Sequence, residues 1–334
     1  MGSRRIKNLQ RKISEFKIFI NMKYFITGGA GFIGSHLVDQ LIKIKKNKIV
    51  VYDNLSSGSK DFIAHHLKNK NFKFIKGDLL NKKLLYKSIK KSDFVFHLAA
   101  NSDIKKSSLS PEIDFNQGLL ATFNVLEAMR KNKIKKIAFA STSAVFGEPI
   151  MLPTPENYGP LKPISIYGAS KLSCEAFISS YCHVFNWQSW IFRFANVIGP
   201  RLTHGAIFDF INKLKINKNK LEVLGNGKQK KSYIYAKDCI NGMIYGIKNG
   251  NDQFNLFNLG TDDSIEVAEI AKILLNQMNL SKKTKIIFTN KDRGWNGDVP
   301  KMLLDTNVIK KLGWKPLYSS RQAIVETVKT NLKF

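Results

Sequence analysis

The fold is decided by one stretch near the start of the chain, Thr27-Gly28-Gly29-Ala30-Gly31-Phe32-Ile33-Gly34. A short apolar run over 23–27 precedes it, and a helical pattern of apolar residues follows it. Glycines at 28, 31 and 34 allow a tight turn, close approach of the backbone to a pyrophosphate, and close packing of helix on strand. The helix N-terminus then turns free N–H groups and the positive end of its dipole toward the phosphates. The stretch therefore predicts a strand, a phosphate-binding turn and a helix.

The next predicted strand ends in an acidic residue that bears on the choice of cofactor. Ile49-Val50-Val51-Tyr52 is apolar, and Asp53 follows it, nineteen residues beyond Gly34. A carboxylate at this distance accepts hydrogen bonds from the adenosine ribose hydroxyls and repels a 2′-phosphate. The pattern predicts NAD rather than NADP. The alternative is a glycine-rich turn without a ligand, and the ordered series of strand, turn, helix, strand and acid argues against it.

Strands and helices continue to alternate after this unit. Strands are predicted over 72–78, 93–100 and 136–140, and a long helix over 111–131. This alternation indicates an α/β fold with a Rossmann-like, doubly wound parallel sheet. Ligands bind outside the carboxyl ends of such strands, where Asp78 and Ala99-Ala100 fall. His97, at the end of an apolar strand, is interpreted as structural.

Three hydroxyl side chains, Ser141-Thr142-Ser143, follow the strand over 136–140. Their place at the end of a parallel strand suits contact with a ligand. Hydrogen bonding within a turn is the competing interpretation, and it best suits Ser141 or Ser143.

Tyr167 and Lys171 are spaced to share one face of a helix, about one turn apart. A nearby ammonium favours the ionised phenol, so we expect the pKa of Tyr167 to fall from ~10 toward neutral pH. Such a phenol can exchange a proton with a sugar hydroxyl or carbonyl. A solvated helix face is the alternative, and it would be preferred if the other motifs did not agree.

The composition describes a basic chain of 334 residues with a formal net charge of +29. No apolar run reaches the ~18 residues that a membrane helix needs. Only eight of the 54 basic residues are arginine, and the lysines are spread along the chain rather than clustered with aromatic residues. A general basic surface is therefore expected, without specific binding of nucleic acid.

Three cysteines, at 174, 182 and 239, lack metal-ligand spacing and are odd in number. Reduced thiols in the cytoplasm are the expectation, and no metal site is predicted. Residues 1–21 form a basic N-terminal extension, to which no function is assigned.

These motifs occur in the order found in the extended short-chain dehydrogenase/reductases. From about residue 23 to 330, the sequence resembles the NAD-dependent nucleotide-sugar epimerases and dehydratases of that family, especially the UDP-glucose 4-epimerase type. The matching stretches are 27–34, Asp53-Asn54-Leu55, Gly77-Asp78, 97–100, the region around Thr142, and Tyr167-x-x-x-Lys171.

The resemblance implies a set of site residues. Thr142, Tyr167 and Lys171 are the expected catalytic group. Expected cofactor-binding residues are Gly28, Gly31, Phe32, Ile33, Gly34, Asp53, Asn54, Asp78, Leu79, Leu98, Ala99, Ala100 and Asn116, with Tyr167 and Lys171. Expected substrate-binding residues are Thr142, Ser143, Asn196, Lys231 and Arg293, and the segment 221–233 is expected to hold the nucleotide.

The sequence departs from the family pattern at two places, and from the 4,6-dehydratases at a third. Lys231 stands where an arginine is usual, which replaces a bidentate clamp by a point charge. Arg293 lies five residues before Asp298, farther than in the enterobacterial-type epimerases. Ser143-Ala144 follows Thr142, whereas the 4,6-dehydratases usually carry Asp-Glu there. The last difference argues against a dehydratase.

The function implied by the resemblance is an NAD-dependent 4-epimerase of a nucleotide sugar, with UDP-glucose and UDP-galactose as the leading pair. A 4-dehydrogenase, a 4-reductase or a 4,6-dehydratase of a nucleotide sugar is the nearest alternative. A nucleotide- or RNA-binding protein without catalysis is a more distant one, and the complete Thr142, Tyr167 and Lys171 group argues against it. The expected partner is a nucleotide-diphosphate sugar, and a homodimer is expected from the family.

The predicted domains are an NAD-binding domain over 22–195, rejoined by about 232–260, and a substrate-binding domain over 196–231 and 261–334. Within the second domain, Asp263 to Glu266 suggests a capping box at the start of a helix over 265–278.

Overall fold

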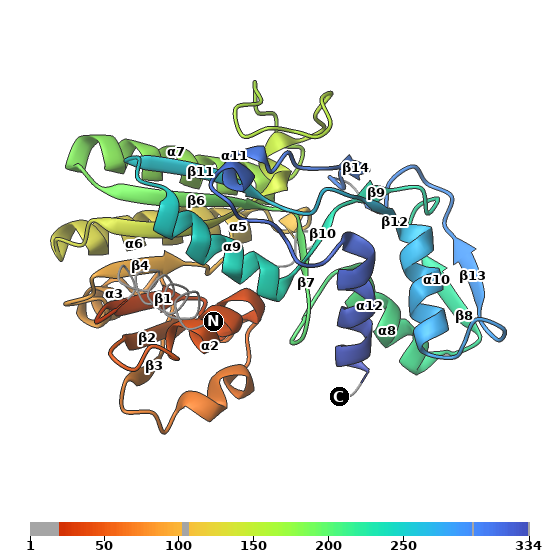
Figure 1. Cartoon of the computed structure of the whole chain (residues 1–334), viewed down its shortest axis with the longest axis horizontal. Coiled ribbons are helices and arrows are strands. Elements are labelled where there is room, and N and C mark those ends of the chain that lie inside the picture. The colour runs from red at the N-terminus through yellow and green to blue at the C-terminus, as the bar shows by residue number, and fades with distance from the viewer. Residues whose placement is uncertain (1–19, 102–106, 296, 333–334) are drawn as a thin grey trace, which may run out of the picture.

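The computed structural model describes residues 20–101, 107–295 and 297–332. The predicted basic extension lies outside these residues, apart from its last two positions. Seven parallel strands form the central sheet, in the order β11-β6-β5-β4-β1-β2-β3 (Figure 1). Their bounds are β1 (Lys23–Thr27), β2 (Lys48–Asp53), β3 (Phe72–Lys76), β4 (Phe94–His97), β5 (Lys136–Thr142), β6 (Gln188–Phe194) and β11 (Phe254–Leu259).

This strand order creates a topological switch point. From β1 the chain builds outward through β2 and β3, then returns to the other side of β1 and continues through β4, β5 and β6. Connections on the two sides of the switch run to opposite faces, so a crevice opens at the carboxyl ends of β1 and β4. The prediction of a Rossmann-like, doubly wound sheet is confirmed.

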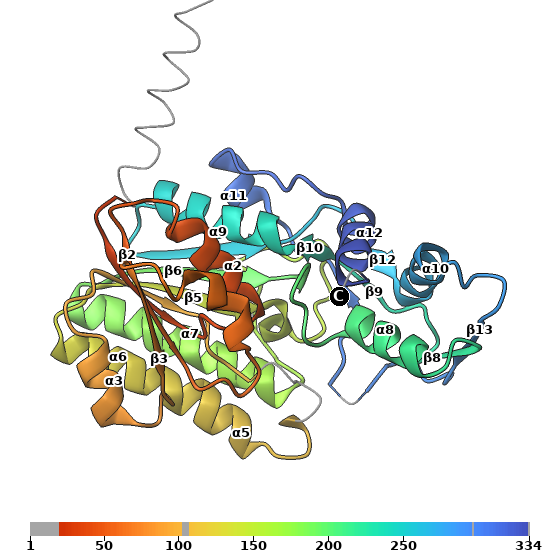
Figure 2. The ribbon, with the colours of Figure 1, turned by 90° about the horizontal axis from the view of Figure 1, so that it is seen from below.

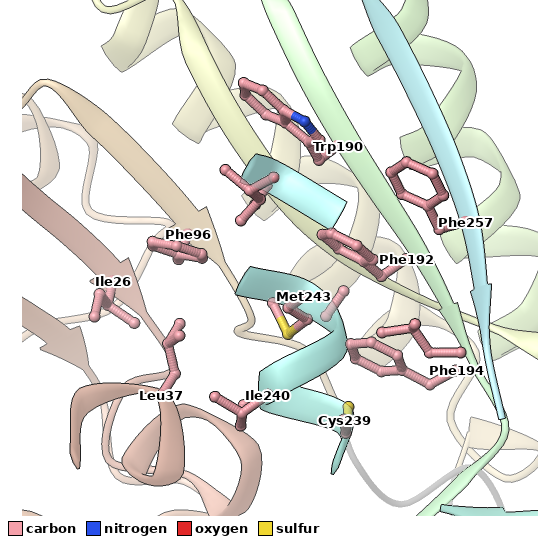
Figure 3. Close-up of a cluster of buried hydrophobic side chains, with 14 of the residues drawn as sticks. Ile26, Leu37, Phe96, Trp190, Phe192, Phe194, Cys239, Ile240, Met243 and Phe257 are labelled. Carbon is pink, nitrogen blue, oxygen red and sulfur yellow. The ribbon is translucent and has the colours of Figure 1, made fainter. Parts of the chain in front are cut away.

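Helices cover both faces of the sheet (Figure 2). One face packs against α2 (Phe32–Leu41) and α9 (Ala236–Asn249), and the other against α3 (Lys82–Ser88), α6 (Ala121–Lys131) and α7 (Ile166–Phe185). Figure 3 shows the first interface, where Phe96 and Phe192 of the sheet meet Leu37 and Met243 of the two helices. These four side chains are fully buried, so the interface holds α2 and α9 against the sheet.

The helix predicted over 111–131 is continuous but not uniform. It comprises α5 (Glu112–Asp114), a π-helical segment η3 (Phe115–Leu120) and α6. The hydroxyl of Ser170 on α7 donates to the carbonyl oxygen of Asp114 at 2.8 Å, which fastens this segment to α7. Single-turn π segments inside helices are frequent at functional sites.

Apart from α11 (Asn307–Lys311), which packs against β11, the remaining elements lie beyond the carboxyl ends of the sheet. They are β7 (Asn196–Ile198), α8 (Ala206–Ile216), β8 (Lys220–Val223), β9 (Lys230–Lys231), β10 (Tyr233–Tyr235), β12 (Ile265–Glu266), α10 (Val267–Gln277), β13 (Lys285–Phe288), β14 (Lys301–Met302) and α12 (Ser320–Asn331). The strands form small sheets, β10-β7, β12-β9-β14 and β13-β8. Helices α8, α10 and α12 bury a separate apolar core with them.

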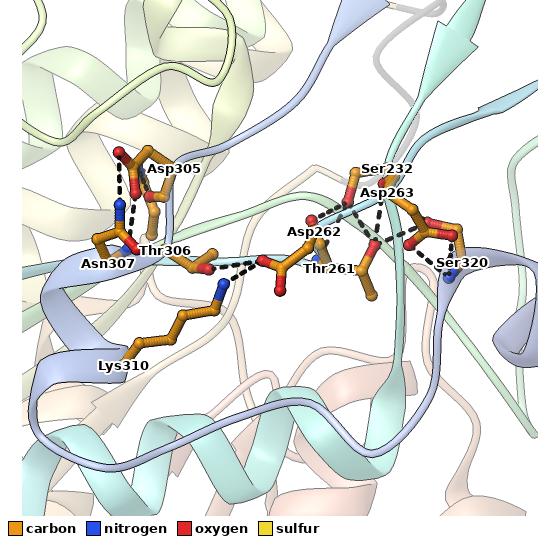
Figure 4. A network of polar contacts seen from close by, with 10 residues as sticks. Ser232, Thr261, Asp262, Asp263, Asp305, Thr306, Asn307, Lys310 and Ser320 are labelled. Carbon is orange, nitrogen blue, oxygen red and sulfur yellow. Dashed lines mark hydrogen bonds and ion pairs between the residues drawn. The ribbon is translucent and has the colours of Figure 1, made fainter.

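The predicted capping box at Asp263 is wrong. Helix α10 begins at Val267 without a side-chain cap, and Ile265–Glu266 instead forms β12, antiparallel to β9. The Asp263 carboxylate accepts the backbone N–H of Ser320 at 2.9 and 3.1 Å, while the Ser320 hydroxyl lies 2.7 Å from that of Thr261 (Figure 4). Asp263 thus binds the backbone at the start of α12. Because α12 is remote in sequence, a local sequence pattern could not predict this contact.

Among the described residues, no helix combines the length and the apolar character that crossing a membrane requires.

Candidate active site

The glycine turn has the shape of a phosphate cradle. Gly28 has φ +69°, and a Cβ there would lie 2.6 Å from the backbone N of Ala99. A Cβ at Gly34 would lie 2.1 Å from the Gly28 carbonyl oxygen. Gly31, at the N-cap of α2, supplies no side-chain hydrogen bond to the first turn of the helix. The turn is thus too tight for side chains, and the helix start remains suited to an anion.

The Asp53 carboxylate is hydrogen-bonded to the glycine turn and to the chain that follows β2. Its Oδ2 accepts the backbone N–H of Ala30 at 2.9 Å, and its Oδ1 accepts that of Leu55 at 2.8 Å. Burial raises the pKa of the Asp53 carboxyl, and these two N–H groups oppose that rise. The carboxylate is therefore held rigidly beside the cradle, at the carboxyl end of β2.

Other predicted cofactor residues surround the cradle. Leu98 donates its N–H to the Thr27 carbonyl oxygen at 3.2 Å, and Ala99 donates to the Thr27 hydroxyl at 3.3 Å. The Asn54 amide donates to Asp78 Oδ2 at 2.9 Å. Leu79 is buried, whereas the remaining members are partly accessible: Asn54, Asp78, Leu98, Ala99, Ala100 and, on η3, Asn116. These residues follow β2, β3 and β4, at the edge where the sequence predicted a ligand.

The structure also brings Thr142, Tyr167 and Lys171 together. Thr142 ends β5, and Tyr167 lies in the first turn of α7, which the Ser165 hydroxyl caps by accepting the N–H of Gly168. The hydroxyl groups of Tyr167 and Thr142 are hydrogen-bonded. The Lys171 ammonium lies 5.9 Å from the centre of the Tyr167 ring. Predicted from two separate motifs, these side chains form one cluster at the carboxyl end of β5.

The expected fall in the pKa of Tyr167 is wrong for this structure. Burial raises the pKa of the phenol, the negative charge of Asp114 adds to the rise, and the hydrogen bond with Thr142 only partly offsets it. Burial also lowers the pKa of Lys171 to about 8. Its ammonium donates to the Ala140 carbonyl oxygen at 2.7 Å rather than to the phenol. Desolvation, which helical spacing does not reveal, outweighs the attraction between phenolate and ammonium.

We expect the burial of Lys171 to give a pH-dependent stability that Lys171→Met removes. The folded pKa of about 8 lies below the unfolded value of ~10.4, so between them the unfolded chain binds a proton that the folded chain does not. The free energy of unfolding should therefore rise with pH across this window, by up to about 1.4 kcal/mol per pH unit, relative to the variant. Urea unfolding of both cofactor-free proteins at about pH 7 and about pH 9.5 measures the difference. A difference between the two proteins that does not change with pH would contradict the assignment.

A buried ion pair close to Thr142, Tyr167 and Lys171 was not predicted from the sequence. Arg193 Nη2 lies 2.7 Å from Glu175 Oε2, and both side chains are almost completely buried. Ser141 donates its hydroxyl to the same carboxylate, and Arg193 is the register partner of Ser141 on the neighbouring strand. Glu175 follows Lys171 by four residues, just as Lys171 follows Tyr167 by four. This repeat of the spacing was the signal in the sequence that could have pointed to Glu175.

The predicted substrate residues lie at the junction with the smaller sheets. The Asn196 side chain donates to the Ser232 carbonyl oxygen at 3.0 Å. Lys231 pairs with the buried carboxylate of Asp298, and Arg293 Nη1 lies 2.5 Å from Glu148. Arg293 also donates to the Asp298 carbonyl oxygen at 3.2 Å. Ser143, partly accessible, opens the single turn η4 (Ser143–Phe146).

The Lys231 and Arg293 segments therefore meet at Asp298, beside the loop that follows β5. The turn hydrogen bond expected from Ser141 or Ser143 is made instead by Thr142, which accepts the N–H of Ala144 at 3.2 Å. Ser141 is engaged with Glu175, as described above.

Residues 25–327 match the family model described as GDP-mannose 4,6 dehydratase. The chain belongs to the NAD-dependent epimerase/dehydratase family. This membership confirms the resemblance to the extended short-chain dehydrogenase/reductases.

Relatives within this family differ in the reaction named for them. A putative UDP-glucose 4-epimerase of Methanocaldococcus jannaschii is 34% identical over 309 residues, covering 91% of this chain and 96% of that protein. UDP-glucuronic acid decarboxylase 4 of Arabidopsis thaliana is 30% identical over 315 residues, covering 92% of this chain and 68% of that protein.

Solved structures of epimerases share the fold. A UDP-galactose 4-epimerase is 38% identical with a TM-score of 0.83, covering 93% of this chain and 99% of its own. A UDP-glucuronic acid 4-epimerase from Bacillus cereus, in complex with UDP-glucuronic acid and NAD, is 26% identical with a TM-score of 0.84 and covers the same shares, 93% and 99%. The chain is thus a member of a family of NAD-dependent enzymes that act on nucleotide sugars.

Proposed function

We propose that this protein is an NAD-dependent 4-epimerase of a nucleotide sugar, acting through a transient 4-keto sugar, with UDP-glucose and UDP-galactose as the pair. The observation that carries the proposal is the hydrogen-bonded pair of Tyr167 and Thr142, with the Lys171 ammonium beside it and the glycine cradle on the neighbouring strands. The epimerases among the similar proteins support it.

Tyr167 and Thr142 handle the proton in this proposal. Tyr167, as phenolate, takes the proton from the sugar O4–H, and Thr142 holds O4 by a hydrogen bond. Because burial raises the pKa of the phenol, the ionised form depends on positive charge close by. Lys171, whose ammonium is the nearest candidate, holds the phenolate and orients it. Tyr167 later returns the proton to O4.

The cradle fits a dinucleotide. Gly28, Gly31, Gly34 and the start of α2 would hold the pyrophosphate, and Asp53 the adenosine ribose. Asn54, Asp78, Leu98 and Ala99 would line the remaining cofactor site. NAD supplies hydride transfer to and from C4 of the sugar when it is bound. Asn196, Lys231 and Arg293, where the two parts of the chain meet, would hold the nucleotide diphosphate.

The residues after Thr142 favour epimerisation over elimination of water. Ser143-Ala144 carries no carboxylic acid, so this position offers no acid to expel the 6-hydroxyl from the 4-keto sugar. Return of hydride to C4 is then the favoured exit.

Product analysis tests the proposed reaction. We expect UDP-galactose with catalytic NAD to yield UDP-glucose, observed by NMR, without net consumption of NAD. Stoichiometric NADH release would indicate a dehydrogenase. A stable 4-keto-6-deoxy product would indicate a dehydratase, and conversion of UDP-glucuronic acid with loss of carbon dioxide would indicate a decarboxylase. Each of these three outcomes contradicts the proposal.

Asp53→Ala should weaken NAD binding and relax the preference over NADP. The carboxylate is fixed beside the cradle by two backbone N–H groups, so its removal deletes both the ribose acceptor and the charge that repels a 2′-phosphate. Calorimetry on cofactor-stripped protein measures both affinities. Asp252→Ala, at an exposed position between α9 and β11, is the control and should bind NAD normally. Equal affinities of the unaltered protein for NAD and NADP would contradict the assignment.

We further propose a homodimer and a cytoplasmic location. Helix α7 exposes Ile166, Phe177 and Val184, an apolar face that a second copy could cover. All three cysteines are buried and unpaired, in keeping with a reducing compartment. Residues 22–195 with about 232–260 would form the NAD-binding domain, and 196–231 with 261–334 the substrate-binding domain. Specific binding of nucleic acid is not part of the proposal.

A further inference from the structure

Two imidazoles converge on one carboxylate oxygen outside the candidate active site. His65 Nε2 lies 2.9 Å and His66 Nε2 2.7 Å from Asp39 Oδ1. Within the described part of the chain, these three residues are the group of histidine, cysteine and acidic side chains whose ligand atoms all lie within 4.8 Å of one another. Asp39 lies on α2, seven residues after its first residue and so ~10 Å along the helix from the cradle. Both histidines end η2.

The spacing of these atoms is close to that of a tetrahedral metal site. Zinc binds imidazole nitrogen and carboxylate oxygen at ~2.0–2.1 Å, so neighbouring ligand atoms of a tetrahedral site lie about 3.3 Å apart. The two nitrogen-to-oxygen distances need to open by only about half an ångström to admit the ion.

The side chains are held in place by their surroundings. His66 is 13% exposed and packs on Phe72, with ring centres 5.7 Å apart. The His65 ring lies against the His66 ring, with the two ring centres 3.9 Å apart. The second carboxylate oxygen of Asp39, Oδ2, pairs with Arg201 Nη1 at 2.9 Å. Metal-binding carboxylates are commonly oriented by such a partner, which here leaves Oδ1 free to face the imidazoles.

We propose that Asp39, His65 and His66 bind one zinc ion, with water completing the tetrahedron. Two imidazoles and one carboxylate suit zinc, whereas magnesium and calcium prefer oxygen ligands alone. Each imidazole would coordinate through Nε2 and carry its proton on Nδ1. Neither the family resemblance nor the reaction proposed above calls for this ion.

The ion would fasten three segments that are distant in sequence. It would tie η2 to α2 and, through Asp39 and Arg201, to the chain that follows β7. The loop leading into η2 already touches the cradle, because Ser59 donates its N–H to the Ala30 carbonyl oxygen at 3.1 Å. Zinc would therefore stabilise the loop that borders the adenosine side of the cofactor site.

Zinc titration of the full chain tests the proposal. Tag-free protein is treated with a chelator and then titrated with Zn²⁺ by calorimetry, and one ion per chain is expected. His65→Gln with His66→Gln should weaken binding at least about 100-fold, because even loss of a group that only orients a ligand costs 10- to 100-fold. His183→Gln, at an exposed position of α7, is the matched control and should bind as the unaltered protein does.

Two further readouts separate this site from loose surface binding. Zn²⁺ should raise the melting temperature of the unaltered protein and of His183→Gln, but not that of the double variant. Co²⁺ in place of zinc should give the visible absorption of a tetrahedral ion. If the double variant fails to fold, His65→Gln alone carries the test, because that side chain is 51% exposed. Absence of stoichiometric binding, or binding unchanged in the histidine variants, would overturn the proposal.

Discussion

Tyr167→Phe is expected to lower turnover by ~100- to 10,000-fold while NAD binding stays intact, because the change removes one proton-transferring hydroxyl and little else. The phenol is hydrogen-bonded to Thr142, at the point where the sheet delivers both residues to one place. The ring itself keeps its position, since α7 is fixed by its Ser165 cap and by the contact of Ser170 with Asp114. Steady-state rates with the accepted nucleotide sugar, together with NAD calorimetry, measure the two properties separately.

Two further variants serve as comparisons for Tyr167→Phe. Thr142→Ala should be slower than the unaltered enzyme but less damaged than Tyr167→Phe, because it removes a positioning hydrogen bond and not the proton carrier. Tyr158→Phe is the matched control, since its hydroxyl only accepts the N–H of Ile150 at 3.2 Å, and it should retain turnover. Near-normal turnover of Tyr167→Phe would mean that another group transfers the proton.

The sequence allowed the dinucleotide half of the chain to be predicted because its signals are local. Glycine spacing, the position of Asp53 and the alternation of strands with helices each depend on neighbouring residues. The sheet confirms that interpretation, with β1 between β2 and β4. The grouping of the proposed catalytic residues could also be predicted, because Thr142 ends a strand and Tyr167 and Lys171 share one helix face.

The properties that the sequence did not predict depend on partners remote along the chain. Asp263 lies beside a helix that it does not cap, because α12, 57 residues later, offers it a backbone N–H at Ser320. The pKa of Tyr167 rises rather than falls because the surrounding protein desolvates the phenol, although the side chain stays partly accessible. Burial of this kind is a tertiary property, which helical spacing cannot report.

The buried ion pair of Glu175 and Arg193 was also not predicted from the sequence. We expect Arg193→Met to lower the free energy of unfolding by about 3–5 kcal/mol. The change would leave the Glu175 carboxylate buried without its partner, and an unpaired buried charge is costly. Arg193 makes three kinds of contact that would be lost: the ion pair at 2.7 Å, a hydrogen bond to the Glu156 carbonyl oxygen at 3.0 Å, and packing over the Phe146 ring at 4.7 Å. Urea unfolding monitored by circular dichroism gives the change in free energy.

The surface pair Arg130 and Glu127 provides the matched control. Its nitrogen-to-oxygen distance is 2.8 Å, similar to that of the buried pair, but Arg130 is 42% exposed. Arg130→Met should therefore change stability far less than Arg193→Met, because solvent screens an exposed ion pair. The double variant with Arg193→Met and Glu175→Met should be more stable than Arg193→Met alone, because it removes the stranded charge as well. Should the double variant prove no more stable than the single one, the cost would come from the lost hydrogen bond to Glu156 and the lost packing over Phe146, and not from the buried carboxylate.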